Sequence, residues 1–353
     1  MDFKIAVIKG DGIGPEIVNE AIKVMDAIGQ KFGHNFNYNE VLMGACAIDE
    51  TGTPLPDETL EVCKNSDAVL FGAIGHPKYD NDPNAKVRPE QGLLKIRKEL
   101  GLYANIRPVA YYPALEKFSP LKPERIEGAD FVVVRELTGG IYFGEKGRSE
   151  DGTVAYDNCT YSIEEIERIA KVGFETAQKR RKKLTLVDKA NVLETSRLWR
   201  DTAPSYPDVK LDFLFVDNAA MQMILAPTQF DVILTENMFG DIISDEGSVI
   251  GGSIGLLPSA SVGAKVGLYE PIHGSFPQGA GKNIANPMAT ILSAAMLLET
   301  SLNLVDEANV IRTAVSKAID ENIATEDLNK ENPVGTDAVG DFIAATVLEA
   351  VKA

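Results

Sequence analysis

Cysteine is scarce in this chain, which disfavours disulfide-stabilised domains and cysteine-ligated metal sites. Its three cysteines, Cys46, Cys63 and Cys159, are far apart and odd in number. They show neither the spacing of a metal-binding motif nor a disulfide framework. This usage fits a reducing compartment. We therefore expect a cytoplasmic protein in which all three cysteines are ordinary core or surface residues.

The chain also lacks a long uninterrupted apolar run. The longest such run, 289–305, is short and carries Glu299, so it predicts a buried helix rather than a membrane span. The amino-terminal segment enters a strand-like pattern directly, without a basic stretch or a cleavage site. We expect neither a membrane segment nor a secretion signal.

Positive charge is in the minority. The formal net charge is −17, with 35 Lys and Arg against 52 Asp and Glu. Such a surface disfavours nucleic acids and anionic membranes as partners. Basic residues nevertheless cluster between Lys86 and Arg107, which favours a small anionic ligand there. A second basic run, 179–183, is typical of a solvated helix end.

Strand-like and helix-like segments alternate along the whole chain, which is typical of the α/β class. The length of 353 residues favours two domains. In the segment 161–179, Ser162 and Glu165 form a capping box at a helix start. A stripe with helical spacing follows and predicts the buried face, namely Ile166, Ile169, Gly173 and Ala177.

Four short apolar runs in the middle of the chain end abruptly in polar residues. They occupy 129–136, 184–191, 211–219 and 231–238, and each is typical of a strand buried on both faces. Ligands of open α/β sheets bind beyond the carboxyl ends of the strands. Four polar clusters at such positions therefore predict one edge of an active site.

Glycine is concentrated in two segments. The first, 9–16, places Pro15 where the dinucleotide-binding fingerprint requires its last glycine. Pro15 suits the first turn of a helix instead, so we do not expect a Rossmann domain. The second segment, 273–287, can wrap its backbone closely around a ligand or can be a plain surface loop. His273 begins this loop and is a candidate cofactor contact.

Asp241 and Asp245 are four residues apart, so on a helix their carboxylates share one face. The pair suits either a divalent cation site or an acidic helix start. A hard cation takes more than two oxygen ligands, and Asp217 at another strand end is the candidate third carboxylate. The spacing alone does not decide between these interpretations.

Arginines and two proton-carrying side chains complete the candidates. Arg97, Arg107 and Arg135 suit bidentate pairing with a di- or tricarboxylate. Lys189, at a strand end, can act as a base where a nearby metal lowers its pKa. Tyr142 lies between glycines, where its hydroxyl can meet a substrate or its ring can pack on the core.

The motifs that carry these residues resemble one family. They are similar to the isocitrate/isopropylmalate dehydrogenase superfamily, and to its isopropylmalate branch in particular, over essentially the whole chain: "GDGIGPE", "LLKIRKELGLYANIRP", "RELTGGIYFG", "DKANVLETSRLWR", "VDNAAMQMI", "TENMFGDIISDEGS", "EPIHGSFP" and "KNIANP". The resemblance implies two α/β/α domains with a central cleft and not a Rossmann fold. Residues 1–101 and 257–353 would form a discontinuous cofactor-binding domain. Residues 102–256 would form an inserted domain with the dimer interface and the metal-binding aspartates.

The resemblance also implies a role for each candidate. Lys189 of the partner subunit and Tyr142 would be the catalytic pair. Asp241 and Asp245, with Asp217 of the partner subunit, would bind Mg2+ or Mn2+. The substrate would contact Arg97, Arg107, Arg135, Asp217, Glu90, Leu93 and Leu94. NAD would contact His273, Gly274, Ser275, Phe276, Pro277, Gln278 and Asn286.

The implied reaction is the NAD-dependent oxidative decarboxylation of (2R,3S)-3-isopropylmalate to 4-methyl-2-oxopentanoate and CO2 in leucine biosynthesis, in a homodimer with shared sites. Leu93 and Leu94 suit an isopropyl group, because burying a third carboxylate against leucine is costly. Gln278 replaces the aspartate usual in NAD-using members, but no cation appears there for a 2′-phosphate, so NAD is still expected. The alternatives are a relative acting on tartrate/malate or homoisocitrate, and a non-catalytic dicarboxylate- and metal-binding protein.

Overall fold

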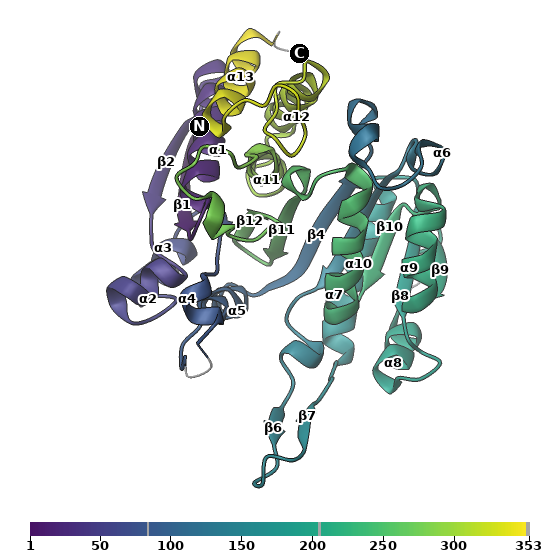
Figure 1. Cartoon of the computed structure of the whole chain (residues 1–353). Coiled ribbons are helices and arrows are strands. Elements are labelled where there is room, and N and C mark those ends of the chain that lie inside the picture. The colour runs from purple at the N-terminus through teal and green to yellow at the C-terminus, as the bar shows by residue number, and fades with distance from the viewer. Residues whose placement is uncertain (83–84, 204–205, 351–353) are drawn as a thin grey trace. The chain divides into compact units, whose positions relative to one another are not determined.

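The computed structural model describes residues 1–82, 85–203 and 206–350, and the chain divides into two compact units (Figure 1). The first unit comprises Met1–Leu102 and Gly252–Ala353, and the second comprises Tyr103–Gly251. Both units combine a sheet with helices, so the predicted α/β class is confirmed. The functions assigned above to the two domains remain predictions.

The sheet of the first unit has the strand order β2-β1-β3-β12-β11. β1 pairs in parallel with β2 and β3, β12 pairs in parallel with β3, and β11 runs antiparallel to β12. β3 is buried along its whole length, as expected for a strand between two layers. The strands are β1 (Asp2–Gly10), β2 (Asn35–Glu40), β3 (Ala68–Ala73), β11 (Pro258–Gly263) and β12 (Gly267–Pro271).

Helices α1 and α11 pack on this sheet, and α12 and α13 pack on those two helices. On the sheet, α3 and α5 contribute Leu60 and Ile96 to a core with β1, β3 and β12. As predicted, Pro15 lies in the first turn of α1. The helices are α1 (Gly14–Phe32), α2 (Ala45–Thr51), α3 (Asp57–Lys64), α4 (Pro77–Asp80), α5 (Pro89–Glu99), α11 (Met288–Thr300), α12 (Val305–Asp320) and α13 (Thr336–Glu349), with short 3-10 turns η5 (Ile254–Leu256) and η6 (Pro277–Gly279).

The sheet of the second unit has the order β4-β5-β10-β8-β9. β4 runs antiparallel to β5, and the remaining neighbours pair in parallel. All four predicted strands are present, but the expectation that the run 211–219 is buried on both faces is wrong, because β9 is the edge strand of the sheet and Phe213 is 40% exposed. β9 also ends at Phe215, and a helix begins at Val216. Asp217 therefore lies in a first helical turn rather than at a strand end. The strands are β4 (Leu102–Ala110), β5 (Asp130–Glu136), β8 (Lys183–Asp188), β9 (Lys210–Phe215) and β10 (Val232–Thr235), with a separate hairpin of β6 (Lys146–Arg148) and β7 (Ala155–Asp157).

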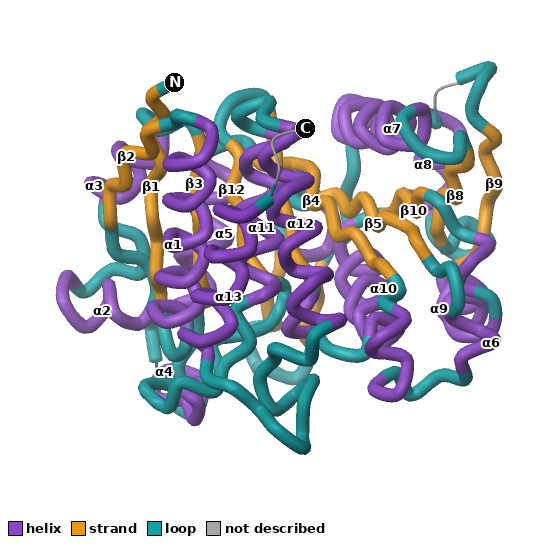
Figure 2. The backbone as a smooth tube through the Cα atoms, turned by 90° about the horizontal axis from the view of Figure 1, so that it is seen from above, coloured by secondary structure: helices purple, strands orange, loops and turns teal. Residues whose placement is uncertain are grey.

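Helices α7 and α8 cover one face of this sheet, and α9 and α10 cover the other (Figure 2). The capping box of Ser162 and Glu165 is present at the start of α7, and the predicted stripe is buried. The helices are α6 (Pro123–Ile126), α7 (Ile163–Gln178), α8 (Glu194–Thr202), α9 (Val216–Leu225) and α10 (Asn237–Ser248), with 3-10 turns η1 (Pro113–Phe118), η2 (Gly140–Tyr142), η3 (Pro227–Gln229) and η4 (Val249–Gly251).

The basic run 179–183 differs from its prediction. It follows the end of α7, but Arg180 is not simply solvated, because its Nε donates to Asp231 at 2.9 Å and its Nη2 donates to Asp130 at 2.8 Å. The side chain of Asp231 is only 1% exposed. A buried carboxylate needs a charged partner, and this need, which the local sequence does not reveal, recruits the arginine.

The predicted buried helix is present, since residues 289–300 of the apolar run lie in α11. No described helix is both long and apolar enough to span a bilayer. The cysteines are free, with Cys63 buried and Cys46 and Cys159 half-buried.

Candidate active site

Five of the predicted site residues meet in the second unit. The Arg135 guanidinium donates through Nη1 to Asp241, and Arg107 Nη1 donates to Asp245 Oδ1 at 2.9 Å. Arg107 Nη2 lies 3.8 Å from Asp241 Oδ1. The Tyr142 hydroxyl donates to Asp241 Oδ2 at 3.0 Å, and the Arg135 guanidinium lies 5.9 Å from the Tyr142 ring centroid. Two cations and two carboxylates thus share one site.

Strand register explains how these residues converge. Asn105 on β4 lies opposite Arg135 on β5, and Arg107, two residues along, points to the same face. Thr235 on β10 pairs with Arg135 from the other side, and α10 begins two residues later. The side chains of β4 and β5 therefore meet the helix that follows β10.

The position of Asp241 and Asp245 in α10 decides between the two interpretations of their spacing. The helix starts at Asn237, and its first turn contains no acidic residue. Asp241 and Asp245 lie beyond that turn, so they do not serve as an acidic helix start. Their carboxylates instead contact Arg107, Arg135 and the Tyr142 hydroxyl.

Burial raises the pKa values of two groups in this cluster. The first is the Tyr142 hydroxyl, for which the negative charge of Asp241 adds to the rise. Tyr142 is therefore a neutral hydrogen-bond donor at physiological pH. Burial also raises the pKa of Asp245, and the repulsion from Asp241 adds to this, while Arg107 opposes it.

The donor set fits a hard divalent cation in part. Asp241 and Asp245 offer carboxylate oxygens, the ligand type that Mg2+ and Mn2+ prefer. Among the described residues of this single chain, no group of three or more His, Cys, Asp or Glu is placed to hold a metal. Asp241 and Asp245 thus offer two carboxylates, and a hard cation held by them would take its remaining oxygen ligands from other groups.

Lys189 and Asp217 form a separate pair in the second unit. Lys189 Nζ donates to Asp217 Oδ1 at 2.6 Å, and this hydrogen bond lowers the pKa of the Asp217 carboxyl. The Lys189 backbone N–H donates to Ser196 Oγ at 3.0 Å. Within the described part of the chain, neither Lys189 nor Asp217 forms a hydrogen bond or an ion pair with Tyr142, Asp241 or Asp245.

The predicted substrate residues of the first unit lie on or beside α5. Arg97 Nη2 donates to Glu270 Oε1 at 3.0 Å, and both side chains are nearly buried. Arg97 Nε is buried without a partner among the described residues. Leu94 is 37% exposed, whereas Leu93 packs partly against the core. Glu90 is exposed.

The loop 273–287 is packed against the first glycine segment rather than lying free on the surface. The Ile13 N–H donates to the Ser275 carbonyl at 2.8 Å. A Cβ on Gly12, which has a φ of 60°, would lie 2.0 Å from that carbonyl oxygen, so only glycine allows this approach. Glu16 accepts the backbone N–H of Gly281 and thereby anchors the far end of the loop.

The loop also offers features that fit a nucleotide cofactor. His273 Nε2 is buried without a partner among the described residues, so it can meet a polar ligand group. Phe276, with a left-handed φ of 38°, and Gln278 are exposed. Asn286 is already engaged, because its Nδ2 donates to Asp327 at 3.0 Å and its Oδ1 accepts from the Met288 N–H at 3.0 Å.

His273 provides a test of this burial through stability. Burial lowers the pKa of its imidazole, so below about pH 6.5 the unfolded chain binds more protons than the folded one. The free energy of unfolding should therefore fall on acidification, by up to about 1.4 kcal/mol per pH unit from this group. Urea unfolding of His273→Gln between pH 7.5 and 5.5 should show a shallower fall than wild type. His76→Gln removes an exposed histidine as the control, and parallel curves for wild type and H273Q would refute this account.

Sequence reasoning missed several residues that shape these sites. Asp11 accepts hydrogen bonds from the N–H groups of Ala45 and Gly75, at 2.8 and 2.9 Å, and so joins two loops of the first unit. Asn105 and Asn237 contact the site arginines. Asn105 stands two residues before Arg107 on a strand, so the period-two rule was the signal that could have found it.

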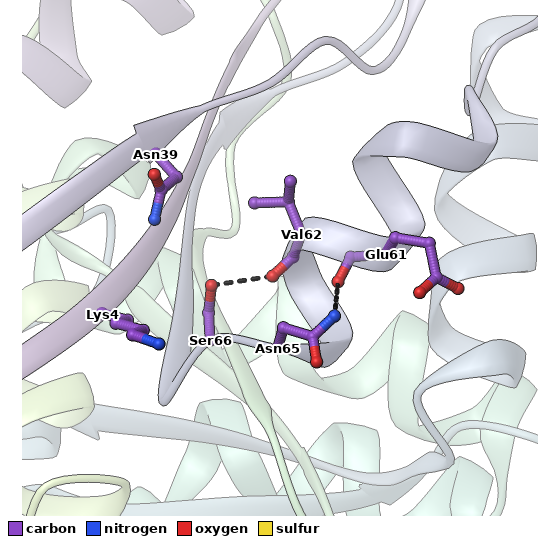
Figure 3. A pocket seen from close by; sticks show the side chains of 6 residues that line it. All are labelled: Lys4, Asn39, Glu61, Val62, Asn65 and Ser66. Carbon is purple, nitrogen blue, oxygen red and sulfur yellow. Dashed lines mark hydrogen bonds between the residues drawn. The ribbon is translucent and has the colours of Figure 1, made fainter.

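A hollow elsewhere in the first unit contains none of the predicted site residues (Figure 3). Ser66 Oγ donates to the Val62 carbonyl and Asn65 Nδ2 to the Glu61 carbonyl, each at 2.8 Å. These side chains are thus satisfied by their own helix end. The hollow is lined by Lys4, Asn39, Glu61, Val62, Asn65 and Ser66.

The fold and site together define an α/β protein with an arginine–aspartate cluster in one unit and a glycine-rich loop packed against α1 in the other. Residues 4–343 match the family described as isocitrate/isopropylmalate dehydrogenase. The chain belongs to the isocitrate/isopropylmalate dehydrogenase family, and it is therefore a dehydrogenase.

Individual relatives cover nearly the full length. The 3-isopropylmalate dehydrogenase of Bacteroides fragilis (strain YCH46) is 58% identical over 356 residues, which covers 99% of this chain and 100% of that protein. The 3-isopropylmalate dehydrogenase of Aquifex aeolicus (strain VF5) is 54% identical over 350 residues, covering 97% and 96%.

Solved structures agree on the fold. The crystal structure of isocitrate dehydrogenase from Methylococcus capsulatus superimposes with a TM-score of 0.88 at 35% identity, covering 98% of this chain and 99% of that chain. The β-decarboxylating dehydrogenase from Thermococcus kodakarensis, in its apo form, gives 0.81 at 36% identity, covering 98% and 96%. The expectation of this fold instead of a Rossmann fold is confirmed.

Proposed function

We propose that this chain catalyses the NAD-dependent oxidative decarboxylation of (2R,3S)-3-isopropylmalate to 4-methyl-2-oxopentanoate and CO2, a step of leucine biosynthesis, in the cytoplasm. The observation that carries the proposal is the cluster of Arg107, Arg135, Tyr142, Asp241 and Asp245. The near-full-length relatives named 3-isopropylmalate dehydrogenase support the choice of substrate.

The arginines bind the substrate carboxylates. The side chains of Arg107 and Arg135 are 11% and 4% exposed, so their guanidinium groups are already held in place before an anion arrives. Arg97 adds a third guanidinium, whose buried Nε still lacks a partner among the described residues. The exposed Leu94 offers apolar surface to the isopropyl group.

Asp241 and Asp245, with Asp217 of the partner subunit, would hold Mg2+ or Mn2+. The chemistry that the cation would supply there is polarisation of the substrate oxygen and stabilisation of the negative charge left when CO2 departs. Arg107 and Arg135 contact the two aspartates of this chain. A dianionic substrate gives both arginines a new partner and frees those carboxylates.

Two side chains move the protons. NAD+, when bound, would supply the acceptor for the hydride of the hydroxyl-bearing carbon of the substrate. Lys189 of the partner subunit takes the proton of that hydroxyl as the carbonyl forms. The bond between the neighbouring carbon, which bears the isopropyl group, and its own carboxylate then breaks. CO2 leaves, and the electron pair of that bond is delocalised onto the new carbonyl as an enolate. Tyr142, which is neutral because burial raises the pKa of its hydroxyl, donates the proton that completes the product.

A homodimer would bring Lys189 and Asp217 of one copy to the site of the other. Large apolar side chains are exposed on two neighbouring helices of the second unit, α9 and α10: Met221 is 56%, Leu225 50% and Ile242 60% exposed. Apolar side chains left open on adjacent helices favour a protein–protein interface. A second copy packed on this face accounts for the need to import Lys189 and Asp217.

One assay tests the function. Purified protein with Mg2+, NAD and 3-isopropylmalate should form NADH, and kcat/KM should exceed that for isocitrate, malate, tartrate and homoisocitrate. A higher kcat/KM for another of these acids would assign the enzyme to that substrate. The absence of NADH with every acid would favour a binding protein without catalysis.

The same assay decides the cofactor. Gln278 is exposed and carries no charge, so it neither repels nor attracts the 2′-phosphate of NADP. We expect a higher kcat/KM with NAD, with weaker discrimination than an aspartate would provide. A preference for NADP would contradict the cofactor assignment and leave the substrate assignment standing.

A further inference from the structure

Both arginines of the cluster are held by a buried asparagine. Asn105 Oδ1 accepts from Arg107 Nε at 2.8 Å. Asn237 Oδ1 accepts from Arg135 Nε at 3.1 Å and from Arg135 Nη2 at 2.8 Å. Asn105 is 0% and Asn237 1% exposed. The same arrangement thus occurs twice, on residues from different elements.

The asparagines occupy one edge of each guanidinium, and the aspartates occupy another. Arg107 uses Nη1 for Asp245, and Arg135 uses Nη1 for Asp241. A guanidinium is planar with donors in fixed directions, so holding the Nε edge sets where its Nη atoms point. The asparagines therefore determine the direction in which each arginine presents its charge.

Asn237 is itself fixed in orientation. Its Nδ2 donates to the Gly139 carbonyl at 3.2 Å, and its backbone N–H donates to the Tyr161 hydroxyl at 3.0 Å. Arg135 offers only donors and the Gly139 carbonyl only an acceptor, so the amide cannot be reversed. Gly139 lies in the loop that leads to Tyr142, so one side chain aligns both an arginine and that loop.

The neutrality of the two amides matters for an anionic substrate. The cluster already contains one carboxylate for each arginine, Asp245 for Arg107 and Asp241 for Arg135. A second carboxylate on the Nε edge would accept the same hydrogen bonds but would give the cluster a net negative charge, which repels an anionic substrate. An amide oxygen orients the arginine and leaves its charge available.

We propose that Asn105 and Asn237 are positioning residues that orient Arg107 and Arg135 through a neutral acceptor and so set substrate affinity. This inference rests on the proposed function for its kinetic test. It assigns no chemical step to either asparagine.

The test is to introduce a charge with almost no change in shape. Asn105→Asp and Asn237→Asp should each raise KM for 3-isopropylmalate about tenfold or more, the size expected for losing one charge-assisted contact. KM for NAD should stay within about twofold, because the change is local to the arginines. Asn65→Asp adds the same charge at an exposed position of the first unit and should leave both KM values unchanged.

Serine variants separate charge from packing. Asn105→Ser and Asn237→Ser leave a gap but keep a neutral oxygen, so each should raise KM for 3-isopropylmalate less than the corresponding aspartate. A serine effect equal to or larger than the aspartate effect would overturn the proposal in favour of plain packing. So would unchanged KM values in folded aspartate variants. If Asn237→Asp does not fold, Asn105→Asp decides.

Failure of the proposed function can be told apart from failure of this inference. A wild-type protein without activity on 3-isopropylmalate refutes the function before any variant is made. The contact between Asn237 and Arg135 is then tested without substrate, by the Tm losses of Asn237→Ser, Arg135→Lys and the double variant. If Asn237 acts on Arg135, the two losses should not add, and strict additivity would overturn the inference.

Discussion

A heterodimer of two inactive variants, Lys189→Met and Tyr142→Phe, should have about half the wild-type activity per dimer. Each homodimer should lose about 10²–10⁴-fold in kcat, the usual contribution of a positioned acid or base. In the heterodimer, one site combines an intact Tyr142 with an intact Lys189 from the other copy, while the second site lacks both. The two copies can be co-expressed with different affinity tags and the mixed dimer purified.

The geometry provides a matched control for this experiment. Lys189 and Asp217 lie 2.6 Å apart in one chain, so they enter a shared site together. A heterodimer of Lys189→Met and Asp217→Asn should therefore stay inactive, because each site receives one damaged member of the pair. Activity in this control, or none in the first mixture, would contradict sites shared between copies.

Asp241→Asn should reduce kcat/KM for 3-isopropylmalate by about 10³-fold or more, because one carboxylate serves several partners. Asp241 accepts from Arg135 and from the Tyr142 hydroxyl, and it is a proposed metal ligand. An amide keeps its shape but loses the charge that holds a cation. Activity titrations of this variant with Mg2+ should show weaker metal binding, so that activity saturates at a higher Mg2+ concentration.

Glu246→Gln, on the same helix, is the matched control. Glu246 is half-buried and lies outside the cluster, so its variant should keep near wild-type activity. Calorimetric titration of wild type should also show tighter Mg2+ binding when 3-isopropylmalate is present, since the substrate draws Arg107 and Arg135 away from the aspartates. A Mg2+ affinity that does not change when 3-isopropylmalate is added would contradict the assigned metal site. An Asp241→Asn enzyme with wild-type kinetics would contradict it as well.

Much of the second unit was predictable because its signals are local. Strands covered on both faces must be continuously apolar, so 129–136 and 231–238 were recognisable together with the polar residues that end them. The capping box of Ser162 and Glu165 depends on residues three apart, and α7 starts there. Local periodicity is enough to locate such elements.

Contacts between elements were not predictable in the same way. The function of Asn105 depends on which residue of β5 lies opposite it, and register is set by packing of the whole sheet. Arg180 resembled a solvated residue until folding placed the buried Asp231 beside it. The spacing of Asp241 and Asp245 suited two interpretations until the start of α10 excluded one.

By itself, the sequence determined the α/β class, the strand ends that carry Arg135 and Lys189, and, through its motifs, the family. Only the tertiary structure decided that Arg107 and Arg135 converge on Asp241 and Asp245, and that neutral amides orient both arginines. The physical reason is the separation along the chain of the residues that interact. Periodicity and capping act within a few residues, whereas the direction of a buried charge depends on partners from two strands and a helix far apart in the chain.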